Sequence, residues 1–192
     1  MRTLVTVLLV SLSATPAPAR AETTKSANLD GHREKRALQF LFKSVQEEIT
    51  SAAMAMPADK YSFAPTEGEF KSVRTFGAQV KHLAATNHIL AAAALGEEAP
   101  ADAGDERGPE SVRTKDEILE YLKRSFDRLG KAVDAIGNPS IGVRSSPISP
   151  IPASTATRTM LIAESLIHAF NHYGQMVVYL RMNGVVPPAS RP

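Results

Sequence analysis

The sequence predicts an all-α protein, an antiparallel four-helix bundle, from three observations. Apolar residues recur at spacings of three and four in separate segments, which is the pattern of an amphipathic helix that packs on one side. Residues that start and stop helices flank these segments, and no segment has the polar and apolar alternation of a β-strand. Four such helices bury their apolar faces most simply by packing together.

The first two helices have clear ends. The first is expected at about 36–56, where Pro57 prevents its continuation. The second is expected at 76–95, between Thr75, whose hydroxyl suits an N-cap, and Gly96, whose freedom to adopt a positive φ suits the end of a helix.

The third and fourth helices are marked in the same way. Thr114 and Glu117 have the spacing of a capping box, which places the third helix at 115–136. The fourth is expected at 155–183, with Gly184 directly after it. It should be mostly buried, because a single formal charge occurs between residues 159 and 180.

Two connections are long. Residues 96–113 are rich in Glu, Asp, Gly and Pro, which predicts a mobile acidic loop. Residues 137–153 contain four prolines and cannot form regular structure. Because this second connection is long for a helical bundle, it is a candidate to cover a site.

The N-terminus has the pattern of a secretory signal peptide, expected at 1–21. A basic residue precedes a short apolar run, and Ala19 and Ala21 form a cleavage signal of small residues. The apolar run is shorter than the about 20 residues that span a bilayer, so no stable membrane insertion is expected. The prediction is a secreted or periplasmic protein whose single domain covers 22–192.

Charge and cysteine content exclude several classes of function. The chain has 22 basic and 20 acidic residues, and the leader contains two of the basic ones. No basic cluster remains to suggest a nucleic-acid partner. The absence of cysteine excludes a cysteine nucleophile and thiolate metal ligands, so any thiol chemistry needs a thiol from a small-molecule substrate.

A polar stripe crosses the otherwise apolar fourth helix. His168 and His172 lie about 40° apart on one helix face, and Glu164 and Gln175 flank them. Two adjacent imidazoles can be satisfied by one cation, and HxxxH is a usual intrahelical spacing for metal ligands. Two histidines alone are also compatible with hydrogen-bonded core residues.

The second helix offers a third ligand. The residues one turn from His82 are small or apolar, so its imidazole should face the core. His88 lies about 120° away, beside Lys81, and is expected at the surface and outside any metal site. His32 precedes the first apolar pattern and is also expected at the surface.

Two segments carry a resemblance to a known family. Residues 56–97, MPADKYSFAPTEGEFKSVRTFGAQVKHLAATNHILAAAALGE, and residues 168–190, HAFNHYGQMVVYLRMNGVVPPAS, resemble the second and last helices of the DinB-like family and their flanking loops. The resemblance implies one divalent metal, zinc or nickel, on His82, His168 and His172. It also implies a metal-dependent transferase that acts with a substrate thiol, and a homodimer.

Other functions fit the same residues. Three imidazoles leave a coordination position open, as in catalytic rather than structural zinc sites. A metal-dependent hydrolase would use water in place of the thiol. A non-enzymatic bundle would bind only a metal or ligand. Glu164 is the candidate catalytic residue, as a general base or as a partner of a metal ligand.

Overall fold

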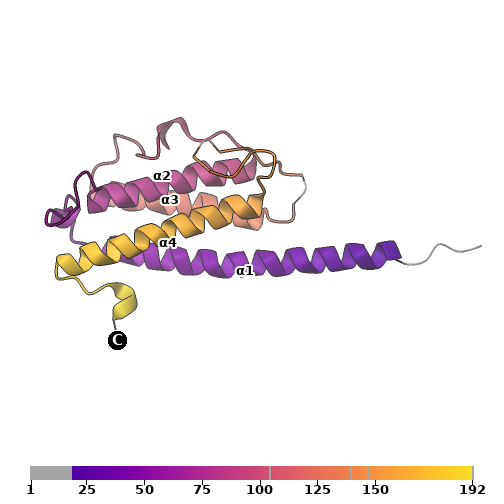
Figure 1. Cartoon of the computed structure of the whole chain (residues 1–192), viewed down its shortest axis with the longest axis horizontal. Coiled ribbons are helices and arrows are strands. Elements are labelled where there is room, and N and C mark those ends of the chain that lie inside the picture. The colour runs from indigo at the N-terminus through magenta and orange to yellow at the C-terminus, as the bar shows by residue number, and fades with distance from the viewer. Residues whose placement is uncertain (1–18, 104, 139, 147, 192) are drawn as a thin grey trace, which may run out of the picture.

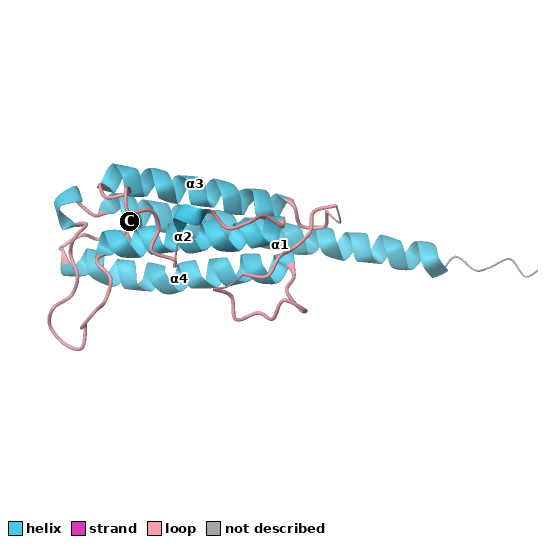
Figure 2. Cartoon of the chain, turned by 90° about the horizontal axis from the view of Figure 1, so that it is seen from above, coloured by secondary structure: helices cyan, strands magenta, loops and turns pink. Residues whose placement is uncertain are grey.

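The computed structural model describes residues 19–103, 105–138, 140–146 and 148–191. These residues form four α-helices and no β-strand, which confirms the predicted all-α bundle (Figures 1 and 2). The α-helices are α1 (Ala19–Ala55), α2 (Phe76–Leu95), α3 (Lys115–Asp134) and α4 (Arg158–Met182). Short 3-10 helices are present at Ala58–Lys60, Ala101–Ala103 and Pro188–Ser190.

The helices differ from a strictly alternating antiparallel order, because α2 and α3 run in the same direction and so do α1 and α4 (Figure 1). Their C-terminal ends lie together, where the guanidinium of Arg158 donates to the carbonyls of Ala94 and Ala135. The starts of both helices lie near the end of α1. The acidic loop between α2 and α3 therefore returns along the bundle (Figure 1).

The capping residues in the sequence predicted the helix ends well. The second helix has the predicted bounds, with the Thr75 hydroxyl as its cap and Gly96 at a φ of 73°. Thr114 and Glu117 form the predicted capping box. The fourth helix starts three residues later than expected, because the hydroxyl of Thr157 caps it.

The first helix is longer than the sequence predicts. It begins at Ala19 instead of near residue 36, and its N-terminal turns project beyond the other three helices (Figures 1 and 2). The apolar periodicity starts only where α1 reaches the bundle, which explains the difference. Residues 1–18 of the expected signal peptide lie outside the described residues, so the leader stays a prediction.

Helix α2 forms the centre of the bundle. All but three of its 20 residues are buried, including several polar ones. Asn87 connects three helices, because it donates to Ser125 on α3 and accepts from Ser165 on α4. Polar groups this deep in a core are stable only when they have partners. Asn87 therefore has its partners on the two neighbouring helices and not in water.

Helix α4 is less buried than the sequence predicts. Its outer face carries apolar side chains that are open to solvent, with Ile167 72% and Val178 49% exposed. The scarcity of charge on α4 thus reflects an apolar surface as well as a buried face. The homodimer stays a prediction, and this face is the surface on which we expect it. Among the described residues, no helix has the length and apolarity needed to cross a membrane.

The buried guanidinium of Arg158 joins three parts of the structure. It donates to Ala94 at the end of α2, to Ala135 at the end of α3, and to the carbonyls of Ile141 and Gly142 in the proline-rich connection. Helix C-termini carry partial negative charge and unpaired carbonyls. One cation at the start of α4 therefore stabilises the ends of two neighbours.

We predict that Arg158→Met lowers the stability of the fold. The change leaves buried carbonyls without donors, which should cost about 3 kcal/mol. For a chain of this size, that loss lowers Tm by roughly 10 °C. Thermal unfolding followed by circular dichroism measures the effect. Arg181→Met removes an exposed guanidinium that donates to Ser190, and should leave Tm nearly unchanged. Equal Tm values for both variants would contradict the role of Arg158.

Candidate metal centre

Three histidines from two helices converge inside the bundle. His82 comes from α2, and His168 and His172 come from successive turns of α4. One ligand nitrogen from each ring lies within 4.8 Å of the other two. The Nε2 atoms of His82 and His168 are 3.1 Å apart. The three residues that the sequence selected as ligands are thus brought together, in a geometry compatible with one bound metal ion.

The packing of α2 on α4 explains the convergence. His82 is 4% and His172 8% exposed, so both rings lie among core side chains. The neighbouring ring centroids are 4.5–5.0 Å apart with steep interplanar angles. At these ring separations one nitrogen of each ring lies within 4.8 Å of the other two. A spacing of four residues on α4 supplies two of these rings from one face.

The orientation of His82 is fixed by the acidic loop. Its Nδ1 lies 2.8 Å from the backbone carbonyl of Glu106. A carbonyl only accepts hydrogen bonds, so Nδ1 carries the proton and Nε2 presents its lone pair to the other histidines. Glu106 holds a φ of 69°, an unusual value for a residue with a side chain. The loop predicted to be mobile is therefore packed against the site.

The orientation of His172 is fixed from within the core. Its Nδ1 lies 2.9 Å from the amide oxygen Oε1 of Gln79. This acceptor also places the proton on Nδ1 and leaves Nε2 free to bind a cation. Gln79 was missed by the sequence analysis, although it lies one turn from His82 on the same helix. Gln175, which flanks the two histidines of α4, is exposed and donates to Asn171.

The third ring, that of His168, has one nitrogen without a partner and one that faces His82. The Nδ1 of His168 is buried and has no hydrogen-bond partner, while its Nε2 faces the Nε2 of His82. In a metal-free protein these two nitrogens can share only one proton. When a divalent ion is bound, all three Nε2 atoms can act as ligands. The residues present therefore fit a divalent metal held by His82, His168 and His172.

Burial keeps the cluster uncharged. Burial, with smaller contributions from the neighbouring histidines and Arg74, lowers the pKa of His172 to about 3 and that of His168 to about 4. The pKa of His82 is also lowered by burial, although the Glu106 carbonyl acts in the opposite direction. Neutral imidazoles are the form that binds metals. The cluster is therefore ready to bind a cation at neutral pH.

The comparisons with known proteins agree with this arrangement. The DinB superfamily profile matches residues 41–176, which is more than half of the chain and includes all three histidines. The chain belongs to the DinB superfamily. No curated protein matches the chain. DinB proteins are metal-binding helical bundles, so the histidine cluster of this DinB protein has both the geometry and the family context of a metal centre.

Glu164 has a different environment from the one expected. It lies one turn before His168 on α4, but its carboxylate accepts a hydrogen bond of 2.6 Å from Ser149. Ser149 belongs to the proline-rich connection, which thereby reaches the α4 face next to the histidines. The general-base role of Glu164 stays a prediction. Any such role must release or share this hydrogen bond.

His88 is not at the surface, and this prediction was wrong. Its side chain is only 9% exposed and lies against Tyr121 of α3, with the ring centroids 4.9 Å apart. The central position of α2 explains the error, because α3 covers the side that would face solvent in an outer helix. His88 is outside the three-histidine cluster, as predicted.

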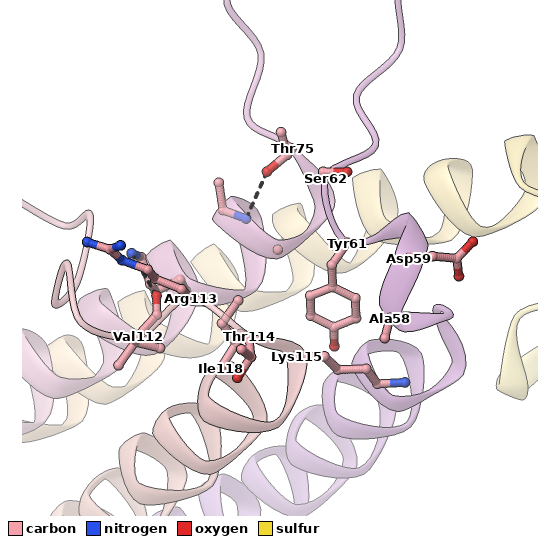
Figure 3. Close-up of a pocket in the computed structure, with 13 residues that line it drawn as sticks. Ala58, Asp59, Tyr61, Ser62, Thr75, Val112, Arg113, Thr114, Lys115 and Ile118 are labelled. Atoms are coloured by element: carbon pink, nitrogen blue, oxygen red, sulfur yellow. Dashed lines mark hydrogen bonds between the residues drawn. The ribbon is translucent and has the colours of Figure 1, made fainter.

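A cavity of about 680 Å³ lies near the start of α2 and α3 and is separate from the histidines (Figure 3). Its lysine side chains donate hydrogen bonds to backbone carbonyls. Lys115 donates to the carbonyls of Met54 and Met56, and Lys81 donates to Pro109 and Val112. These contacts join loops to helices, so the cavity gives no independent sign of a ligand.

We predict that Gln79→Leu weakens metal binding by about 10- to 100-fold, because loss of a partner that orients a ligand typically has this effect. The imidazole of His172 would lose the acceptor that fixes its proton on Nδ1. Competition with a chelator of known affinity measures the dissociation constant. Gln175→Leu is the matched control and should bind metal normally. Equal affinities for the two variants would contradict the assigned role of Gln79.

We predict that the metal-free protein loses stability as the pH falls from 7 to 5. Unfolded histidines protonate near pH 6.5, whereas burial holds the folded pKa of His168 at about 4. The unfolded state then binds more protons than the folded state, so the free energy of unfolding decreases with falling pH. Thermal unfolding in EDTA at both pH values measures this. A His168→Leu variant should show a smaller decrease; an identical one would contradict the explanation.

Proposed function

We propose that this DinB protein is a metal-dependent transferase that acts on the thiol of a small substrate. The observation that carries the proposal is the convergence of three neutral imidazoles, a cluster to which the described residues add no carboxylate. Three ligands leave an open position on a tetrahedral ion, as in catalytic sites. Ligand type does not separate zinc from nickel, and we propose one of these two as the bound metal.

The charge of the site favours an anionic substrate group. Neutral ligands do not offset the two positive charges of a divalent ion. The positive charge of Arg74 acts on all three histidines, whereas the Glu106 carboxylate, 3.7 Å from the outer Nδ1 of His82, acts on His82. A divalent ion with an open position lowers the pKa of a thiol or water next to it. Because the chain has no cysteine, the thiol must come from the substrate.

The protein residues have distinct tasks in this proposal. His82, His168 and His172 hold the ion, while the Glu106 carbonyl and Gln79 keep protons on the outward nitrogens of two of these rings. These fixed hydrogen bonds mean that little reorganisation is needed when a substrate binds. The proximity of Glu164 to His168 in sequence makes its carboxylate a candidate proton acceptor.

We infer that this activity operates outside the cytoplasm, in the periplasm or as a secreted protein. The support is the pattern at residues 1–21, in which a basic residue, a short apolar run and small residues follow in order. Mass spectrometry of protein from an exporting host tests the inference. A mature N-terminus at Glu22 is the expected result, and an intact N-terminus on protein retained in the cytoplasm would contradict it.

Elemental analysis and activity screens on untagged protein test the proposed function. We expect one zinc or nickel ion per chain. We also expect the sulfur of a low-molecular-weight thiol to be transferred to an electrophilic substrate, and this activity should disappear with His172→Ala. The alanine variant should stay helical, because the apolar faces of the bundle do not depend on the ion. His32→Ala removes an exposed histidine and is the matched control.

The other outcomes separate the alternatives. Ester hydrolysis without thiol transfer would replace the proposal with the hydrolase function. One bound ion per chain with neither activity would favour a non-enzymatic metal-binding bundle. A protein that binds no divalent ion after incubation with zinc and nickel would overturn all three.

A further inference from the structure

A second cavity, of about 420 Å³, opens between α2 and α3. None of its lining residues lies on α4, so it is separate from the three-histidine cluster. Its volume is within the range of small-molecule sites, about 300–1,000 Å³. The polar residues that line it are His88, Glu97, Arg124, Asp127, Arg128 and Lys131.

His88, which lines the cavity, is one of a pair of contacting residues that each carry a buried group without a partner. The Nδ1 atom of His88 and the hydroxyl of Tyr121 are both buried without a hydrogen bond, and their rings are in contact. Each unpaired polar atom of this kind costs about 1–3 kcal/mol. Three other buried side-chain atoms of the described residues, on Thr86, Ser146 and His168, also lack a partner. His88 is the member of this pair that lines the cavity, so a molecule bound there would contact its ring.

The charged side chains at the rim differ in their ion pairs. The two acidic residues each hold a cation, because Glu97 binds Arg128 at 2.5 Å and Asp127 binds Lys123 at 3.3 Å. Lys131 has no ion pair within the described part of the chain. Arg124 lies over the Tyr121 ring and makes one long ion-pair contact, of 3.5 Å, with the exposed Glu120. Two cations are therefore available to a ligand.

His88 adds a neutral polar group to this cationic rim. Burial, followed by the charge of Arg128, lowers its pKa to about 4, so the ring is uncharged at neutral pH. A neutral imidazole can donate one hydrogen bond to an anion. Its Nε2 is the nitrogen that remains for a ligand, because Nδ1 is enclosed by protein atoms.

We propose that this cavity binds a small oxyanion, a phosphate or carboxylate group, between Arg124 and Lys131 with His88 at its inner end. Guanidinium and ammonium groups form charge-assisted hydrogen bonds with such oxygens. The arrangement requires neither the metal nor the transferase activity. Anion binding here is therefore independent of the function proposed above.

Titration of the full chain with inorganic phosphate and with succinate tests the proposal. The protein is first stripped of metal with EDTA, so that the anions have no ion to bind at the three-histidine cluster. Nuclear magnetic resonance of the imidazole groups then reports where binding occurs. We expect saturable shifts of the His88 signals, with a Kd of about 1 mM or below, and little change in the other buried histidines.

Charge variants provide the control. The double variant Arg124→Gln, Lys131→Gln should weaken binding by at least about tenfold, because two charge-assisted hydrogen bonds are lost. The double variant Lys43→Gln, Lys71→Gln makes the same change in net charge at exposed positions elsewhere, and should bind normally. Circular dichroism confirms that each variant is folded.

A third variant separates binding from folding. His88→Phe keeps the ring packed on Tyr121 and removes the unpaired nitrogen, so stability should be kept or raised while binding weakens. Saturation by phosphate alone, succinate alone or both supports the proposal and identifies the preferred group. If neither anion gives a saturable His88 shift, the proposal is overturned. It is also overturned if the Arg124 and Lys131 double variant binds the anion as tightly as the unchanged protein does.

Discussion

Three imidazole rings share one largely buried space between α2 and α4, and their nitrogen atoms must be satisfied there. Two of the rings have their outer nitrogens bound to oxygen acceptors, which directs the inner nitrogens of His82 and His172 toward each other. Without a cation, these inner lone pairs compete for the proton of His168. The requirement for a shared positive partner connects the core packing of this DinB protein to its chemistry.

The path of the chain brings the partners of the histidines to the site. Because α2 and α3 run in the same direction, the connection between them must return along the bundle, and Lys81 and His82 bind its carbonyls. This return brings Glu106 to the metal centre. Arg158 joins the opposite ends of α2 and α3 to α4. The loop and the buried cation therefore fix the relative positions of the helices that carry the ligands.

The sequence predicts those features that depend on local chemistry. Caps such as Thr75 and Thr114 act within one helical turn, so the helix starts they mark were predicted correctly. The HxxxH spacing likewise fixes His168 and His172 on one face. His88 was misplaced because burial depends on neighbouring helices, which periodicity within α2 does not reveal. Gln79 and Glu106 could not be assigned as partners without the three-dimensional arrangement.

The central claim is that one divalent ion binds all three histidines. Crystals of the protein loaded with zinc, with anomalous diffraction measured on both sides of the zinc absorption edge, test it most directly. The account predicts a single strong peak at about 2.0–2.1 Å from one nitrogen of each of His82, His168 and His172. A peak bound by two or fewer of these residues, or located elsewhere on the chain, would contradict it.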